Sequence, residues 1–515
     1  MQNMRAIGLN FLVAAACGAL LSACAVGPDY KKPELATPAA YKENTGWKQA
    51  APADAIKRGA WWEVFGDPVL NDLEKQIDVS NQSLKQAEAQ YRQASALVSS
   101  ARASFWPTLT TSPSATRSGR YGTSGGGIVS GGTVIGGTST SGNPGSSHPA
   151  NAYQLPFAAS WEPDLWGSVR RTVEGDVANA QASAATLEST RLSLHASLAQ
   201  TYFQLRIADE QKRLLDDTVD GYRKSLQLTQ NQYNVGVAAR ADVVQAETQL
   251  KSAQVQAIDL GVARAQYEHA IALLIGKAPA EFSLAAQPLK VQPPVVPVDV
   301  PASLLERRPD VAVAERQAAA ANAQIGVAEA AWFPTLTLSA SGGYQNSVLS
   351  QLLDAPSRYW SIGPRLAETL FDGGARRAQS AQVRAAYDVA AANYRQVALA
   401  AFGNVEDNLA ALRILEQEAA AQDDAVKSAE QALTITINQY RAGIVSYLNV
   451  ITAQATAYSN ERAAIALLGT RLNDSVALVK ALGGGWEEKD LPAAGDISRK
   501  STAPGDSATE TAKQR

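Results

Sequence analysis

The stretch FWPTLT occupies residues 105–110, and a near copy, WFPTLT, occupies residues 332–337. In each copy, two aromatic residues and a proline precede an alternation of threonine and leucine. Proline ends a helix because it lacks an amide donor and clashes with the preceding turn, whereas a period of two is typical of a strand. The stretch therefore predicts, at two places in the chain, a helix that ends and a strand that begins.

The strand pattern extends beyond both copies. Within Thr335–Tyr344, leucine, alanine, glycine and tyrosine fall on one face and threonine and serine on the other. Arg358–Phe371 continues as a second alternating run, and Ser104–Tyr121 and Asn151–Leu165 resemble an earlier pair. An apolar and a hydroxyl-rich face suit a sheet between lipid and water. Aromatic residues gather near the strand ends as in an interfacial girdle, although core packing explains any single one equally well.

Two long segments, 164–278 and 365–491, contain no proline and are rich in alanine. We therefore expect long helices from about Ser168 to Tyr233 and from about Gly374 to Tyr440. Each would extend for roughly 100 Å at about 1.5 Å per residue. Apolar spacings that alternate between three and four predict a coiled-coil seam on each helix. The seam residues are Leu215, Val219, Tyr222, Leu226, Thr229 and Tyr233, and Val426, Ala429, Leu433, Thr436 and Tyr440.

The chain reads as two structural repeats, each with the order helix, strand, loop, strand, long helix, tight turn, helix. The turn sequence at Gln232–Gly236 returns at Gln439–Gly443. The first hairpin is the longer one, and its surplus lies in a Gly/Ser/Thr-rich tract between Ser118 and Ser147, as in an extracellular loop. The predicted domains are a signal peptide (1–23), an acylated extended segment (24–60), the first repeat (61–278), a Pro-rich connector (279–301), the second repeat (302–486) and a disordered tail (487–515).

The N-terminus has the pattern of a lipoprotein signal peptide. The apolar run Phe11–Leu21 follows a basic start and is too short to span a bilayer. It leads into Leu21-Ser22-Ala23-Cys24, which resembles a bacterial lipobox; an ordinary signal with an incidental cysteine is the alternative. We expect Cys24 to carry a diacylglycerol thioether and an N-acyl chain such as palmitate. Ala25, in place of an aspartate associated with inner-membrane retention, favours the outer membrane by resemblance.

Composition excludes several functions. The 46 Lys and Arg against 49 Asp and Glu give a net charge of −3, which is no footprint for nucleic acid. The three histidines are scattered, and no Gly-rich phosphate loop precedes a helix. We interpret the acidic residues of the first long helix, including Asp209 and the pair Asp216–Asp217, as a solvated face. We expect no enzyme, no metal site and no cofactor other than the lipid on Cys24.

Each repeat offers two candidate barrel strands, so one chain offers four. Small barrels need about eight strands, and open sheet edges in lipid are costly. The strands must therefore be shared among chains. Two chains would give eight strands and three would give twelve, and the pattern does not choose between them.

Several motifs occur together in one order: VGPDY at Val26–Tyr30, WWEVFGDP at Trp61–Pro68, ERRPD at Glu306–Asp310, the two Pro-Thr-Leu strand starts and the two Tyr-x-x-Gly turns. In this order the chain resembles the outer membrane factors of bacterial tripartite efflux pumps, in the lipoprotein branch of nodulation-T type. The resemblance implies a mixed α and β membrane protein that forms a homotrimer. It implies a twelve-stranded outer-membrane β-barrel, with four strands per chain, continuous with a long periplasmic α-helical coiled-coil barrel.

The resemblance also implies site residues at two helix-turn-helix tips, Asn234–Asp242 and Arg441–Asn449. The adaptor-docking positions are Val235, Gly236, Val237, Ala238, Ala442, Gly443, Ile444 and Val445. Glycine permits the chain reversal; a plain helical hairpin is the alternative. The pore-aperture positions are Leu448, Asn449, Thr452 and Asp242. Family members often carry acidic residues at the positions of Asn449 and Thr452, so we expect a weaker cation-binding ring here.

The favoured function is passive conduction of drugs, other toxic amphiphiles or metals out of the cell. Partners would be outer membrane lipid, a periplasmic adaptor and a proton-driven inner-membrane transporter. One alternative is an exit duct for ATP-driven protein secretion. Another is a structural coiled-coil lipoprotein without a pore, against which the paired alternating strands argue.

Overall fold

The computed structural model describes residues 25–38, 40–43, 60–119, 149–294 and 306–500. Cys24, the predicted signal peptide and most of the Gly/Ser/Thr-rich tract lie outside the described residues. The chain divides into two compact units. Unit 1 comprises Met1–Asp29, Ser99–Glu174 and Ala323–Arg384, and unit 2 comprises Tyr30–Val98, Gly175–Asn322 and Ala385–Arg515.

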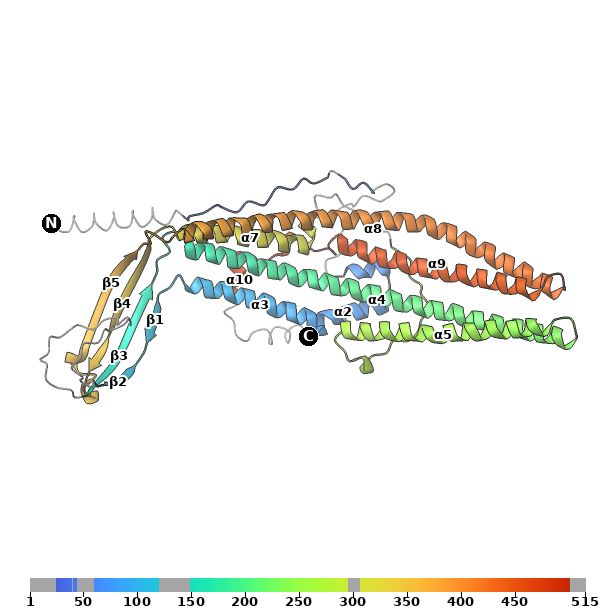
Figure 1. Ribbon diagram of the computed structural model, residues 1–515, viewed down its shortest axis with the longest axis horizontal. Coiled ribbons are helices and arrows are strands. Elements are labelled where there is room, and N and C mark those ends of the chain that lie inside the picture. The colour runs from blue at the N-terminus through green and yellow to red at the C-terminus, as the bar shows by residue number, and fades with distance from the viewer. Residues whose placement is uncertain (1–24, 39, 44–59, 120–148, 295–305, 501–515) are drawn as a thin grey trace. The chain divides into compact units, whose positions relative to one another are not determined.

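Unit 1 contains an antiparallel sheet whose strands lie side by side (Figure 1). Both β1 and β2 pair with β3, which pairs with β4, and β4 pairs with β5. The bounds are Thr108–Thr111 (β1), Ser114–Ser118 (β2), Ala150–Trp161 (β3), Thr335–Asn346 (β4) and Arg358–Ala367 (β5). The last strand therefore ends before Phe371, where the alternating sequence pattern ends.

The first predicted strand is divided at residues 112 and 113. Thr108 lies opposite Ser160 in β3, and Ser114 lies opposite Gln154, so β1 and β2 keep one register on the same partner. Pro113 has no amide proton to donate to the ladder, which explains the interruption. We therefore treat β1 and β2 as one strand with a proline break.

The register aligns the two faces predicted from the alternation. One row across the sheet joins Leu109, Ala159, Ala340 and Ile362. The adjacent row joins Thr108, Ser160, Ser339 and Gly363. Large side chains of the apolar rows are exposed, including Trp360 at 81%. The sheet thus separates an exposed apolar face from a face of hydroxyls and glycine.

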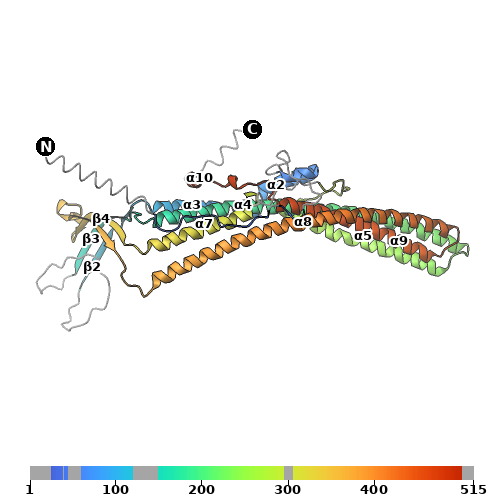
Figure 2. The same ribbon diagram turned by 90° about the horizontal axis from the view of Figure 1, so that it is seen from above.

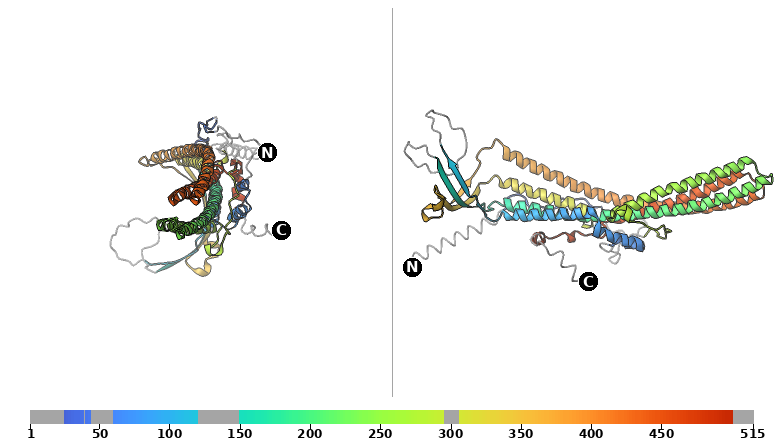
Figure 3. Two further views of the ribbon diagram at one scale, coloured as in Figure 1. Left: turned by 90° about the vertical axis from the view of Figure 1, so that its right-hand side faces the viewer. Right: turned by 90° about the horizontal axis from the view of Figure 1, so that it is seen from below.

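The two long helices begin and end within one residue of the predicted bounds. α4 (Ser168–Asn234) and α8 (Ala375–Arg441) contain 67 residues each. The helices that follow them, α5 (Arg240–Leu274) and α9 (Tyr447–Ala481), contain 35 residues each. α8 and α9 run alongside each other to their turn (Figures 1 and 2), as do α4 and α5 (Figures 1 and 3).

Shorter helices complete the fold. α3 (Gln82–Ala103) and α7 (Pro309–Ala330) have 22 residues each, and both end just before a Pro-Thr-Leu strand start. The remaining elements are η2 (Trp61–Phe65), α2 (Pro68–Ser80), η3 (Pro279–Glu281), η4 (Leu349–Gln351), η5 (Ala355–Ser357), η6 (Glu488–Asp490) and α10 (Ala494–Lys500). Within the described ranges, no helix has both the length and the apolar composition of a membrane span.

An aspartate lies just before each long helix, four residues before α4 and three residues before α8. The Asp164 carboxylate accepts hydrogen bonds from the backbone N–H groups of Val169 and Arg170, both at 2.9 Å. The Asp372 carboxylate accepts them from Gly374 and Arg376, at 2.9 and 3.1 Å. The Arg376 guanidinium also donates to Asp372 and, with these backbone donors, lowers the pKa of Asp372 to about 2. Each carboxylate therefore satisfies amide donors that a helix start leaves open.

Unit 2 has its core where α4 meets η2, α2 and α9. Tyr202, Phe203 and Leu205 of α4 are at most 1% exposed in the main apolar cluster. The predicted seam of α4 is largely buried, with Leu215 and Thr229 as examples, but Tyr233 is exposed. The seam thus packs as predicted up to the last turn of the helix.

Two regions of unit 2 differ from the sequence-based expectation. Asp209 is buried rather than solvated, because Arg206 and Arg264 pair with it at 3.2 and 2.7 Å. Asp216 and Asp217 do lie on an exposed face, as predicted, paired with lysine and arginine one turn away. The segment 487–500, expected to be disordered, forms η6 and α10, and Ile497 is 1% exposed against Val98 and Ala180.

Candidate docking tips and aperture

The two turns that follow α4 and α8 share one backbone geometry. At the first, the Gly236 N–H donates to the Tyr233 carbonyl at 2.9 Å, and the Val237 N–H donates to the Gln232 carbonyl at 2.8 Å. At the second, Gly443 and Ile444 donate to Tyr440 and Gln439, at 3.0 and 2.9 Å. This pair of bonds is the Schellman motif of a helix C-terminus. Gly236 and Gly443 have φ of 81° and 74°, a left-handed conformation that disfavours other residues.

Apolar side chains are exposed at both turns. Val235 and Val237 are 75% and 69% exposed, and Ile444 is 72% exposed. Ala238 and Val445 are half-buried, and Ala442 is exposed. Water is a poor environment for such side chains, and clustered exposed apolar residues often mark an interaction surface. We call these two turns, with residues 235–238 and 442–445, the docking tips.

The four predicted aperture residues lie in the first turns of α5 and α9. Leu448, Asn449 and Thr452 share the exposed side of α9, opposite the buried Val450 and Ile451. Asp242 is half-buried, and its carboxylate accepts a hydrogen bond from the Ala239 N–H at 3.2 Å. The acidic group predicted for the aperture thus also caps the start of α5.

A small core beneath the tips joins all four helices. Tyr440 of α8 and Tyr447 of α9 have ring centroids 5.4 Å apart, and the Tyr440 hydroxyl donates to Thr229 of α4 at 3.3 Å. Ala246 of α5 is buried in the same cluster. One turn further, Gln454 of α9 donates to Ser225 of α4 at 2.8 Å. Tyr440 belongs to the predicted seam of α8 and is buried as that seam implies, whereas the burial of Tyr447 was not predicted.

The sequence analysis also did not predict the site in unit 1 where the N-terminal segment binds; we call this site, residues 26–29 packed around Arg171, the seat of the N-terminal segment. Arg171 is 5% exposed, and its guanidinium donates to the carbonyls of Val26 and Gly27 and to the Asp29 carboxylate. The Val26 N–H donates to the Trp166 carbonyl at 3.1 Å. The VGPDY motif therefore supplies acceptors for a buried arginine. Cys24, two residues before Val26, lies outside the described residues.

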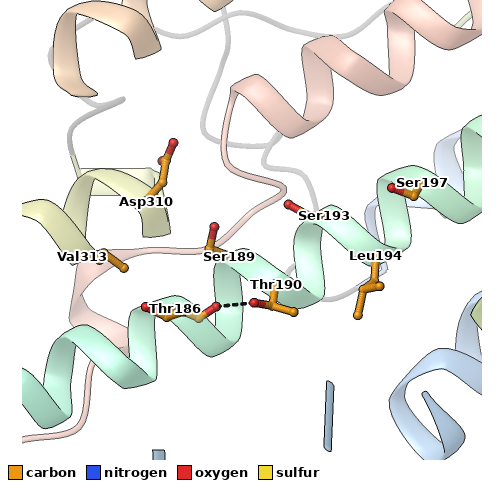
Figure 4. A pocket seen from close by; sticks show the side chains of 8 residues that line it. All are labelled: Thr186, Ser189, Thr190, Ser193, Leu194, Ser197, Asp310 and Val313. Carbon is orange, nitrogen blue, oxygen red and sulfur yellow. Dashed lines mark hydrogen bonds between the residues drawn. The ribbon is translucent and has the colours of Figure 1, made fainter. Parts of the chain in front are cut away.

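One hollow of unit 2 does not have the chemistry of a substrate site. It has a volume of about 400 Å³ and lies along one side of α4 near the start of α7 (Figure 4). Its two threonine hydroxyls bond to their own helix, Thr186 to the Ala182 carbonyl and Thr190 to the Thr186 carbonyl, both at 2.8 Å. Its one carboxylate, Asp310, is paired with Arg308 at 2.6 Å. Among the described residues, no cluster of His, Cys, Asp and Glu could hold a metal ion.

Comparison with known proteins gives the family. The family model of the outer membrane efflux protein matches residues 73–277 and 300–484, so the chain belongs to this family. The unmatched interval between them, 278–299, nearly coincides with the Pro-rich connector. Proteins of this kind are channels in the outer membrane and not enzymes, as the sequence analysis predicted.

Two curated relatives are similar over most of their length. The chain is 30% identical over 479 residues to the probable efflux pump outer membrane protein TtgC of Pseudomonas putida, covering 91% of this chain and 94% of that protein. It is also 30% identical over 479 residues to the pyoverdine export outer membrane protein OpmQ of Pseudomonas aeruginosa, covering 93% and 97%. Among solved structures, the outer-membrane channel OprN has a TM-score of 0.80 and 29% identity, covering 90% of this chain and all of that chain.

Proposed function

We propose that this chain is the outer membrane channel of a tripartite efflux pump and conducts small molecules passively to the exterior. Drugs, other toxic amphiphiles and metals are the candidate cargo. The observation that carries the proposal is the pair of docking tips, which present exposed apolar side chains on one shared turn geometry. They suit a periplasmic adaptor, which would connect this channel to a proton-driven inner-membrane transporter.

The proposed channel is a homotrimer with a twelve-stranded barrel. Among the described strands, β5 has a partner on one side only, and so does the strand formed by β1 and β2. Unpaired backbone groups at a sheet edge favour pairing with another chain, and in lipid such edges are costly. Three copies of four strands would close the sheet, with the exposed apolar face toward lipid. The equal lengths of α4 and α8, and of α5 and α9, support the two-repeat architecture.

We propose that Cys24 is acylated and that its lipid adds an anchor to the barrel. Val26, Gly27 and Asp29, which follow Cys24 in the chain, hydrogen-bond with Arg171. These contacts support the proposal, because they fix the chain next to the lipid-bearing residue in unit 1. Such an anchor needs no folded domain of its own. Labelled palmitate should appear in the protein and be lost in Cys24→Ser.

The test of the function is a crosslinked pull-down of the tagged protein from native membranes, read by mass spectrometry. Recovery of an adaptor with a proton-driven transporter would support efflux, and the transporter would indicate the cargo. Recovery of an adaptor with an ATP-dependent transporter would instead support the exit duct for protein secretion. Planar-bilayer conductance separates both from a structural lipoprotein, since a protein without a pore carries no current.

The aperture is proposed to bind cations weakly. Asn449 and Thr452 are neutral. The Asp242 carboxylate already accepts a hydrogen bond from the Ala239 N–H at the start of α5. Divalent cations should therefore block the conductance weakly, and Asn449→Asp should strengthen the block. Strong block of the unaltered channel that Asn449→Asp leaves unchanged would count against this proposal.

A further inference from the structure

A carboxylate and a histidine are paired in the interior of unit 2, away from the docking tips and the aperture. Glu74 of α2 is 0% exposed and His195 of α4 is 2% exposed. The Glu74 Oε2 and His195 Nδ1 atoms are 2.7 Å apart, which is hydrogen-bond distance. Buried ionisable groups are costly unless paired, and the conduction function proposed above does not use this pair.

Each side chain of the pair has one polar atom without a hydrogen-bond partner among the described residues. Among the described residues, Glu74 Oε1 and His195 Nε2 have no hydrogen-bond partner. Trp62 of η2 stacks on the imidazole, with ring centroids 4.4 Å apart. A cavity of about 110 Å³ adjoins His195 and is also lined by Trp61, Trp62, Arg191, Gly484 and Trp486. His195 thus adjoins a small cavity whose lining includes three tryptophans.

The charged groups around the pair come from α2 and α4. Asp78 of α2 lies 3.6 Å from His195 Nε2 and pairs with Arg191 of α4 at 3.1 Å. Arg191 also pairs with Glu188 at 2.6 Å. From η2 the packed side chain is Trp62, and from the segment after α9 the lining residues are Gly483, Gly484 and Trp486, none of them ionisable. One histidine and one arginine therefore face three carboxylates.

Proton affinity is raised at both members of the pair. Burial raises the pKa of Glu74 to about 7, although the hydrogen bond from His195 opposes this. Burial lowers the pKa of His195, but Asp78 and Glu74 outweigh burial and the net pKa is raised. Both groups therefore hold protons more tightly in the folded chain than in the unfolded chain. Their contributions to stability are present at low pH and are lost as pH rises through the folded-state pKa values.

We propose that Glu74 and His195 form a proton-operated latch that holds α2 on α4. When the pair keeps its extra proton, a charge-assisted hydrogen bond or a neutral pair fixes α2. When the proton leaves, an ionised Glu74 stays buried beside a neutral imidazole, and the docking of α2 weakens. η2 carries Trp61, Trp62 and Phe65 into the same core, so residues 61–80 respond as one segment.

Hydrogen exchange of the full-length protein in detergent, read by mass spectrometry at pH 6 and pH 8, tests the latch. After correction for intrinsic exchange rates, protection of α2 should fall about tenfold between these pH values, since the pKa of Glu74 moves from 4.5 to about 7. Protection of the first half of α5, near the docking tip, serves as the internal reference. The last turn of α5 is unsuitable, because the Asn81 side chain at the end of α2 donates to its Leu274 carbonyl at 2.6 Å. Equal protection of α2 at both pH values would overturn the proposal without the need for any variant.

Variants assign the effect to the pair. Glu74→Gln keeps the shape and a hydrogen bond to His195 but cannot ionise, so most of the pH dependence of α2 should disappear. The matched control is Asp72→Asn on the exposed side of α2, where Asp72 pairs with Lys75 at 3.5 Å; it should keep the full dependence. If the double variant Glu74→Gln/His195→Gln retains the tenfold change with the first half of α5 still protected, the latch lies elsewhere and the proposal is wrong. Conductance does not enter this test, so its result is independent of the proposed function.

Discussion

The two docking tips have the same backbone conformation, but the side chains beside them are packed differently. Both end a 67-residue helix with a Schellman turn at a glycine, and a 35-residue helix begins four residues after that glycine. At the first tip, Tyr233 is exposed and Asp242 caps the following helix. At the second tip, the matching tyrosine, Tyr440, is buried against Tyr447. The glycine therefore sets the turn, whereas the neighbouring side chains decide how firmly each tip is held.

The largest expected effect separates the two tyrosines. Tyr440→Ala should destabilise the second tip by about 3 kcal/mol, because it removes a buried ring and leaves a cavity. Tyr233→Ala at the matching position should cost less than about 1 kcal/mol, because that ring is exposed. Hydrogen exchange of the last turns of α8 and α4 measures both. Equal effects would mean that the tips are held alike.

Replacing the glycine of either tip should lower the stability of the protein by the same amount, which is smaller than the effect of Tyr440→Ala. Gly236→Ala and Gly443→Ala each force a side chain into the left-handed region, at a cost of about 1 kcal/mol. Thermal unfolding of the two single variants measures the loss. A large difference between them would show that the shared hydrogen bonds do not define the two turns equally.

A smaller effect is expected from the cap. Asp242→Ala removes the carboxylate that accepts from the Ala239 N–H and should cost about 0.5 to 1 kcal/mol. Asn449→Ala at the matching position of the second tip is the control and should cost less. Exchange rates of the first turn of α5 and of α9 report the two losses separately. An Asn449→Ala loss as large as that of Asp242→Ala would remove this distinction between the tips.

The smallest effect on stability, and the largest on assembly, should come from the exposed apolar residues. Val237→Ser and Ile444→Ser alter side chains that are 69% and 72% exposed, so unfolding should change by less than about 0.5 kcal/mol. Each should reduce adaptor recovery in the crosslinked pull-down. Full recovery with both residues replaced would show that the adaptor docks elsewhere.

Much of the fold could be predicted because its signals are local. Absent prolines and alternating spacings gave α4 and α8 within one residue, and the glycines gave both turns. Asp209 was misjudged because its partner Arg264 lies on the next helix, 55 residues away. The burial of Tyr440 follows from its place in the predicted seam, whereas its ring contact with Tyr447 depends on packing between α8 and α9. No pattern within one segment carries that information.

The seat of the N-terminal segment has a practical consequence for protein engineering. Residues 26–29 are part of the packing around Arg171, which is nearly inaccessible to water. A tag, linker or fluorescent fusion inserted between Ala25 and Asp29 would shift these acceptors out of register and leave a buried guanidinium short of partners. Fusions belong after residue 500, beyond the last buried contact of α10.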